Sequence, residues 1–114
     1  RQNMSEEKFP ISGIACDMTG TITEFGTGAE ELFGYTRDEL VNKGNVGMFH
    51  TEENIKNLVP VLLQTASEKG VWEDIVELVR KDGTHFKGKL KVIPLKKDEK
   101  QVGFMGTTHF VENI

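Results

Sequence analysis

Two spacings of hydrophobic residues divide the chain. Between about residues 52 and 69, apolar residues recur at helical spacing and form one stripe: Ile55, Leu58, Val59, Leu62, Leu63 and Ala66. From residue 72 onward the spacing falls to two, which is typical of strands with one face buried and the other in water. The pattern therefore predicts one long helix followed by three strands over residues 72–80, 84–95 and 102–111.

The first half of the chain predicts a hairpin and two short helices. Strands are expected over residues 12–17 and 21–25, joined by a turn, and Gly34 separates the helical turns that follow. Thr27 is expected to cap the first of these helices. Thr36 and Glu39 have the spacing of a capping box at the start of the second. Pro60 interrupts the long helical pattern, so it either kinks one helix or lies in the first turn of a second.

The order of these elements predicts the fold class. Two early strands, three late strands and helices between them indicate an α+β fold with one five-stranded antiparallel sheet and the helices packed on one face. A length of 114 residues fits one domain. Residues 1–8 are expected to be a linker or the end of an N-terminal helix, and residues 9–114 the domain. Because the chain begins with Arg1, we expect it to be a fragment of a larger protein.

Composition narrows the function classes. A formal net charge of −4 argues against nucleic acid as the main partner, since binding to phosphates needs a concentrated basic patch. The single cysteine, Cys16, excludes an intrachain disulfide and favours a reducing, cytoplasmic location. No apolar run approaches the roughly 18 residues of a membrane span. The chain has no nucleophile elbow, phosphate loop or metal-binding spacing of histidines, so we expect neither an enzyme nor a metal site.

Five local sequences occur in an order that resembles a known family. They are Asp17–Ile22, Gly28–Tyr35, Glu39–Leu40, Arg80–Thr84 and Val102–Gly106. Together they resemble the PAS domain over nearly all of the chain. The resemblance implies strand order 2-1-5-4-3, with the helices folded over one sheet face around an internal pocket. The family often has asparagine where this chain has Gly26, so a side chain that would brace the hairpin against the helices is missing.

The same resemblance implies a role in signalling. Such domains serve as sensory or dimerising inputs of two-component histidine kinases, cyclic-di-nucleotide enzymes and chemoreceptors. We therefore expect a homodimer with an output domain in the same protein. Ten apolar residues are expected to converge on the pocket: Phe25, Leu32, Phe33, Met48, Phe49, Leu58, Leu62, Phe86, Leu90 and Phe104. The alternative for each of them is a plain core position.

Cofactor chemistry can be tested against individual residues. The flavin photosensors of this family need a cysteine within the segment 45–49, and the only cysteine here is Cys16, on the first predicted strand. A cysteinyl-flavin photocycle is therefore not expected. Haem-binding members commonly supply a histidine from the long helix, which has none here. His50, just before that helix, is the histidine best placed to face the pocket, although an imidazole at such a position is more often an exposed cap or turn residue.

Three functional hypotheses remain open from the sequence. The leading one is a sensor domain that holds a small ligand or a cofactor of unknown identity in its pocket. The second is a ligand-free module for protein interaction or dimerisation, with a filled core. The third is a haem-based redox or gas sensor that binds iron through His50.

Overall fold

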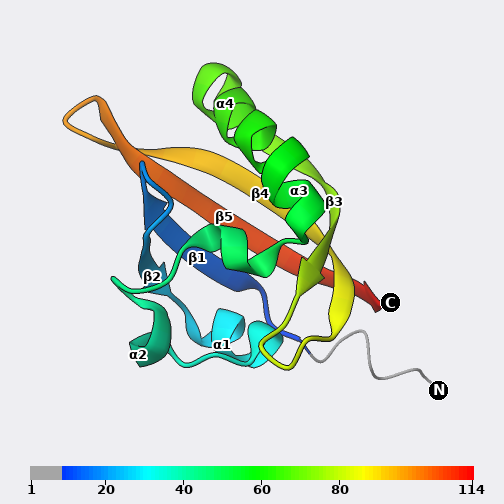
Figure 1. Cartoon of the computed structure of the whole chain (residues 1–114). Helices are drawn as coiled ribbons and strands as arrows, with labels where there is room; N and C mark the ends of the chain where they lie inside the picture. The colour runs from blue at the N-terminus through cyan, green and yellow to red at the C-terminus, as the bar shows by residue number, and fades with distance from the viewer. Residues whose placement is uncertain (1–8) are drawn as a thin grey trace.

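One antiparallel sheet forms the body of the protein. The structure, a computed structural model, describes residues 9–114, so the segment expected to be a linker or helix end, residues 1–8, lies outside the described residues. Five strands, β1 (Ser12–Asp17), β2 (Ile22–Phe25), β3 (Trp72–Val79), β4 (His85–Lys97) and β5 (Lys100–Asn113), pair in the order β2-β1-β5-β4-β3. Figure 1 shows the helices gathered on one face of this sheet. The predicted fold class and strand order are confirmed.

The helices between β2 and β3 are short. They are α1 (Thr27–Phe33), α2 (Arg37–Leu40), the 3₁₀ helix η2 (Val46–Phe49), α3 (Glu52–Asn57) and α4 (Val59–Lys69). The long helix predicted over residues 52–69 is therefore two helices. Pro60 lies in the first turn of α4, where its missing N–H would have had no partner within the helix. The second of the two alternatives for Pro60 is the correct one.

The predicted apolar stripe is broken with the helix. Leu62 and Ala66 of α4 are buried against the sheet, at 2% and 0% exposure, whereas Ile55 of α3 is 43% exposed. The six apolar residues predicted to form one stripe therefore do not share one buried face, because Ile55 lies outside it. Because α3 ends and α4 begins at Leu58, the two helices do not share one set of inward-facing positions. The buried face of α4 therefore does not continue along α3.

The inner face of the sheet carries the core. Along β4, Phe86, Gly88, Leu90 and Val92 are buried while the lysines between them are exposed, as the alternating pattern predicts. Strands β4 and β5 run further than expected because a two-residue turn joins them and Lys97 pairs directly with Lys100. Both turn residues, Asp98 and Glu99, have positive φ, the geometry that such tight hairpins require.

Backbone and capping contacts fix the first helices. The capping box is confirmed: the Thr36 hydroxyl accepts from the Glu39 amide (3.2 Å) and the Thr36 amide donates to the Glu39 carboxylate (2.7 Å). The expected cap at Thr27 is wrong, because Gly26 is the N-cap residue and Thr27 already lies within α1. The Gly26 amide donates to the Gly13 carbonyl (3.0 Å). A backbone hydrogen bond therefore joins the sheet to α1 where the family often has an asparagine side chain.

Candidate functional site

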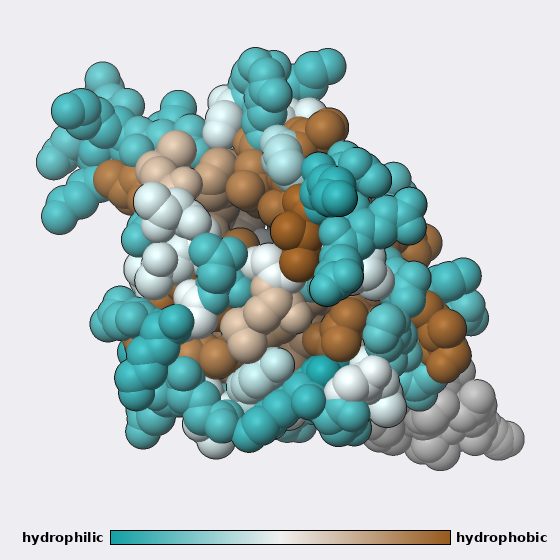
Figure 2. Space-filling model, in the orientation of Figure 1, coloured by the Kyte–Doolittle hydropathy of each residue, from teal (hydrophilic) through white to brown (hydrophobic). Residues whose placement is uncertain are grey.

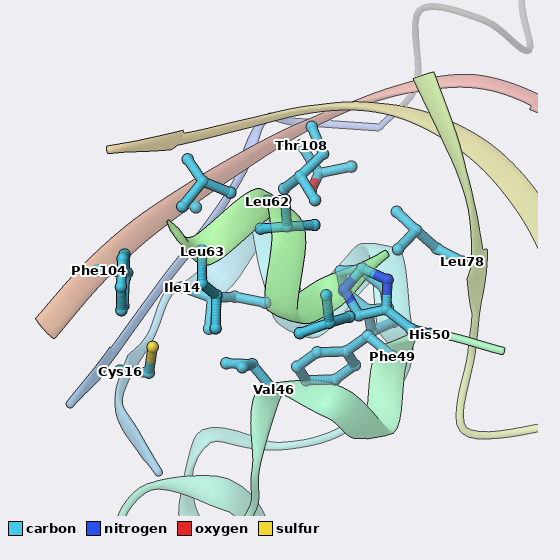
Figure 3. Close-up of a pocket in the computed structure, with 15 residues that line it drawn as sticks. Ile14, Cys16, Val46, Phe49, His50, Leu62, Leu63, Leu78, Phe104 and Thr108 are labelled. Atoms are coloured by element: carbon cyan, nitrogen blue, oxygen red, sulfur yellow. The ribbon is translucent and has the colours of Figure 1, made fainter. Parts of the chain in front are cut away.

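A cavity of about 60 Å³ lies between the inner face of the sheet and the helices η2 and α4 (Figure 3). Figure 2 shows the surface hollowed between α4 and η2, with apolar side chains around the opening. Side chains from the sheet, from α1 and from both of these helices meet there. The lining residues are Ile14, Cys16, Phe33, Val46, Phe49, His50, Val59, Leu62, Leu63, Leu78, Leu90, Val92, Phe104, Gly106 and Thr108. The cavity is therefore almost entirely apolar.

Half of the predicted pocket residues line this cavity: Phe33, Phe49, Leu62, Leu90 and Phe104. The other five do not line it and belong to the surrounding core: Phe25, Leu32, Met48, Leu58 and Phe86. Whether a predicted residue lines the cavity or lies in the surrounding core depends on its position along a strand or helix, and not on its residue type. Phe86, for example, faces the same way as Leu90 but lies four residues nearer the β3–β4 turn, where Phe33 covers it. Contact of the lining residues with a ligand stays a prediction.

Several lining residues were not predicted from the sequence to line the pocket. They are Ile14, Cys16, Val46, Val59, Leu63, Leu78, Val92, Gly106 and Thr108. The strand members among them could have been found from alternation, because Gly106 and Thr108 share the inward phase of Phe104 on β5. Whether Val59 and Leu63 line the cavity depends on the tilt of α4 against the sheet, and no local sequence pattern specifies that tilt.

His50 is the cavity's main polar side chain. It is the C-cap residue that follows η2, its amide donates to the Gly47 carbonyl (3.0 Å), and an isolated antiparallel bridge pairs it with Leu78 of β3. Its Nδ1 atom is buried and has no hydrogen-bond partner within residues 9–114. Burial lowers the pKa of the imidazole from 6.5 to about 4, because the charged form would lose its hydration. The ring is therefore neutral at pH 7, with one donor and one acceptor nitrogen.

A hydrogen-bonded asparagine holds the segment that carries His50. The Asn45 side chain accepts from the Gly47 amide (2.9 Å) and donates to the Thr19 carbonyl (3.0 Å). An isolated bridge also pairs Asn45 with Thr21. These contacts join η2 to the β1–β2 turn. The position of His50 is therefore fixed by the β1–β2 turn on one side and by Leu78 of β3 on the other.

The other titratable candidates contribute less to the site. Cys16 lines the cavity, and desolvation raises the pKa of its thiol, which keeps it protonated as a small apolar group. His85 lies within 2.6 Å of the Glu77 carboxylate across the β3–β4 pair, and His109 is exposed on β5. Among the residues that the structure describes, no three metal-ligating side chains are grouped together.

The cavity does not fit the large cofactors of the family. Pockets that hold drug-sized or cofactor-sized ligands measure roughly 300–1,000 Å³, several times the volume found here. Within residues 9–114, no arginine or lysine lines the cavity to meet phosphate or propionate groups. His50 does face the cavity, but a haem would have no room beside it. The hypothesis of a haem sensor through His50 therefore does not fit the residues present.

A chain of aromatic rings leads from the cavity to the ends of the described structure. Phe49 and Phe33, both in the cavity wall, have ring centres 4.6 Å apart, and Phe33 lies 5.5 Å from Phe86. Phe86 lies 5.9 Å from Phe110 of β5, which lies 4.7 Å from Phe9. Edge and tilted contacts at such distances each stabilise by about 0.5–1.5 kcal/mol beyond burial. A displacement of Phe33 would therefore be transmitted to Phe9 and Phe110, near both ends of the described residues.

Arg80 holds the same end of the sheet through hydrogen bonds. Its guanidinium donates to the Leu32 carbonyl (3.2 Å), the Thr84 hydroxyl (3.1 Å) and the Asn113 side-chain oxygen (2.8 Å). These partners belong to α1, the β3–β4 turn and the end of β5. One side chain therefore joins three segments that are far apart in sequence.

The Arg80 guanidinium also lies against aromatic rings. It is 4.5 Å from the centre of the Phe86 ring, 5.8 Å from that of Phe9 and 6.0 Å from that of Phe110. Cation–π contacts of this kind contribute from about 0.5 to 2 kcal/mol. Arg80, Phe9, Phe86, Phe110 and Asn113 are called the Arg80 cluster below.

No helix within residues 9–114 is long and apolar enough to cross a membrane. A search of curated proteins found no significant sequence match. Among solved structures, the chain is similar to a PAS domain of a protein from Colwellia psychrerythraea, with a TM-score of 0.84 and 19% identity, covering 90% of this chain and 86% of that one. It is also similar to the LOV domain of the blue-light activated histidine kinase EL346 from Erythrobacter litoralis, with a TM-score of 0.76 and 23% identity, covering 92% and 99%.

These two similarities concern the fold, because their identities are low. The family comparison is independent of them. A sequence model described as the PAS domain matches residues 11–111, which is most of the chain and includes β1 to β4, most of β5 and all the residues that line the cavity. The chain therefore belongs to the PAS domain family.

Proposed function

We propose that this domain is the sensory input of a larger signalling protein and that a small molecule binds in its cavity. The observation that supports this most is the cavity itself, an apolar space with few polar groups, bounded by the sheet, η2 and α4. An apolar cavity of about 150 Å³ is known to admit benzene. The space of about 60 Å³ here suits a smaller occupant unless α4 moves outward.

The contacts around the cavity suggest how occupancy would be relayed. A ligand pressing on Phe33 or Phe49 would shift the aromatic chain that ends at Phe110, and so the Arg80 cluster at the end of β5. A ligand shifts such an equilibrium only by as much as its affinities for the two states differ. The output we propose is a histidine kinase or a cyclic-di-nucleotide enzyme in the same cytoplasmic protein. The similar LOV domain from Erythrobacter litoralis belongs to such a kinase.

Native mass spectrometry of the purified domain, followed by denaturation, tests ligand binding. Extra mass in the folded state that is lost on denaturation is the expected result. Gly106→Ala provides a variant with a smaller cavity, because its new methyl group would lie 3.5 Å from Leu90 without strain. Gly13→Ala is the matched control, since it adds the same methyl group to β1, where nothing lies within 4 Å. Extra mass should fall in the first variant and persist in the second.

The alternative of a ligand-free dimerisation module has one observation in its favour. The outer face of the sheet exposes three large aliphatic side chains, Ile75 (53%), Ile93 (37%) and Val111 (39%). Ion pairs such as Lys89–Glu73 (3.8 Å) lie among them. A native mass equal to twice the bare chain, with no additional mass, would support this alternative against the sensor.

A further inference from the structure

We infer that the ligand of this cavity is a small uncharged molecule with a hydroxyl group, and that this group exchanges a hydrogen bond with the imidazole of His50. The inference rests on the proposed function, since it names the chemical class of molecule that the cavity would hold.

The first argument is the hydrogen-bonding state of His50. Its Nδ1 atom is buried, and no polar atom of residues 9–114 lies within hydrogen-bond reach. Buried polar atoms are nearly always paired, because an unpaired one loses its hydration without gaining a partner. Figure 3 shows the ring at one side of the cavity, between Phe49 and Leu78. A ligand in the cavity is therefore well placed to supply the missing partner.

The second argument is the charge of the cavity. In the part of the chain that the structure describes, His50 and Cys16 are the only titratable groups that line it, so no carboxylate, ammonium or guanidinium faces it from the sheet or from the helices. Burial keeps the imidazole neutral and the thiol protonated at pH 7. A charged ligand would lose its hydration here without meeting an opposite charge, which is costly. The occupant is therefore uncharged.

The third argument combines size with hydrogen-bonding capacity. A neutral imidazole has one donor and one acceptor, and a hydroxyl is the smallest group that can complement either nitrogen. Apart from His50 and Thr108, the walls are formed mainly by aliphatic and phenyl groups. The remainder of the ligand is therefore apolar, and a short aliphatic alcohol has the required properties.

The experiment is an NMR titration of the whole domain with three probes: 1-butanol, xenon and butanoate. Methyl signals of Ile14, Leu62 and Leu78, which line the cavity, report binding. The ring nitrogens of His50 report hydrogen bonding directly. Because a neutral hydrogen bond is worth about 1 kcal/mol, His50→Leu should weaken 1-butanol binding roughly five- to tenfold. His50→Gln, which keeps a donor and an acceptor, should lose less.

The outcomes separate this inference from the proposed function. It is supported if 1-butanol shifts the His50 ring nitrogens while xenon shifts only the methyl signals, and if butanoate shifts neither. It is overturned if 1-butanol binds wild type and His50→Leu equally, or if butanoate binds as well as the alcohol. If no probe shifts the methyl signals, the proposed binding role of the cavity fails as well. The ring-nitrogen measurement on wild type decides the matter even if a variant does not fold.

Discussion

The Arg80 cluster and the cavity lie on the same inner face of one sheet, and they are packed in opposite ways. In the cluster, rings and a guanidinium lie in contact, and three hydrogen bonds of Arg80 reach separate segments. In the cavity, aliphatic walls enclose about 60 Å³, and the Nδ1 atom of His50 has no partner in the described chain. The difference indicates that stability is concentrated at one end of the sheet and that room for a ligand is left at the other.

The largest expected effect on stability comes from removing a buried ring of the Arg80 cluster. Phe86 is fully buried, and Phe86→Ala should lower the free energy of unfolding by about 3–5 kcal/mol because it removes packing and leaves a void. Urea denaturation of wild type and variant measures the loss. Phe33→Ala is the matched change at the cavity, because Phe33 has the same side chain and similar burial but already borders empty space. Similar losses for both variants would contradict the contrast drawn between the two regions.

Removing the guanidinium should have the next largest effect. Arg80→Met keeps much of the side-chain volume but loses three hydrogen bonds and the cation–π contacts. We expect a loss of about 2 kcal/mol, together with faster hydrogen exchange at the end of β5. Arg80→Lys retains the charge but not the planar fork, so it should fall between Arg80→Met and wild type. Unchanged exchange near Asn113 would show that Arg80 does not hold the end of this strand.

Acid should weaken the cavity region through His50. Its pKa is about 4 in the folded protein and 6.5 in the reference state. Between these two pH values, His50 is protonated in the unfolded chain and neutral in the folded protein. The contribution of neutral His50 to the free energy of unfolding is therefore complete above pH 6.5 and is lost as the pH falls toward 4.

Between pH 7 and pH 5 we expect the His50 contribution to fall by about 1–2 kcal/mol. Urea midpoints at the two pH values measure it. His50→Gln is the reference, since the other titrating groups are common to both proteins. Parallel pH profiles for wild type and His50→Gln would argue against a buried, neutral His50.

The smallest expected effect is a gain. Gly106→Ala adds a methyl group to the cavity wall at ordinary van der Waals distances, 3.5 Å from Leu90 and 4.0 Å from Val92. It also restricts the unfolded chain, so we expect stabilisation of about 0.5 kcal/mol. Gly88→Ala, on β4, should instead destabilise, because the new atom would lie 2.7 Å from Thr108. Thermal unfolding of the two variants should therefore move in opposite directions.

The contrast between the two regions also explains what the sequence could predict. The strands and the capping box at Thr36 were accessible because they depend on local spacing and turn chemistry, whereas the strand order was implied by the family resemblance alone. The core positions of β4 followed from alternation alone. Thr27 was assigned as a cap because its residue type suits one, yet the backbone makes Gly26 the N-cap.

The cavity wall was harder to predict because it depends on where a space is left, not on which residues are apolar. Phe33 and Phe86 have the same side chain and similar burial, but only Phe33 borders the cavity. The break at Leu58 sets which residues of α4 face inward, and the sequence left that break as one of two alternatives. The role of Arg80 was not visible at all, since its partners come from segments up to 48 residues away.

The position of Cys16 has a practical consequence. It is the single thiol of the chain, it is buried, and it borders the cavity. A thiol reagent added to the folded protein can therefore react at one position, and only while that wall is accessible. The reaction rate then measures how often the cavity opens, and any compound that fills the space will slow it. The rate at which Cys16 is modified can therefore be used to screen candidate ligands, and no engineered residue is needed.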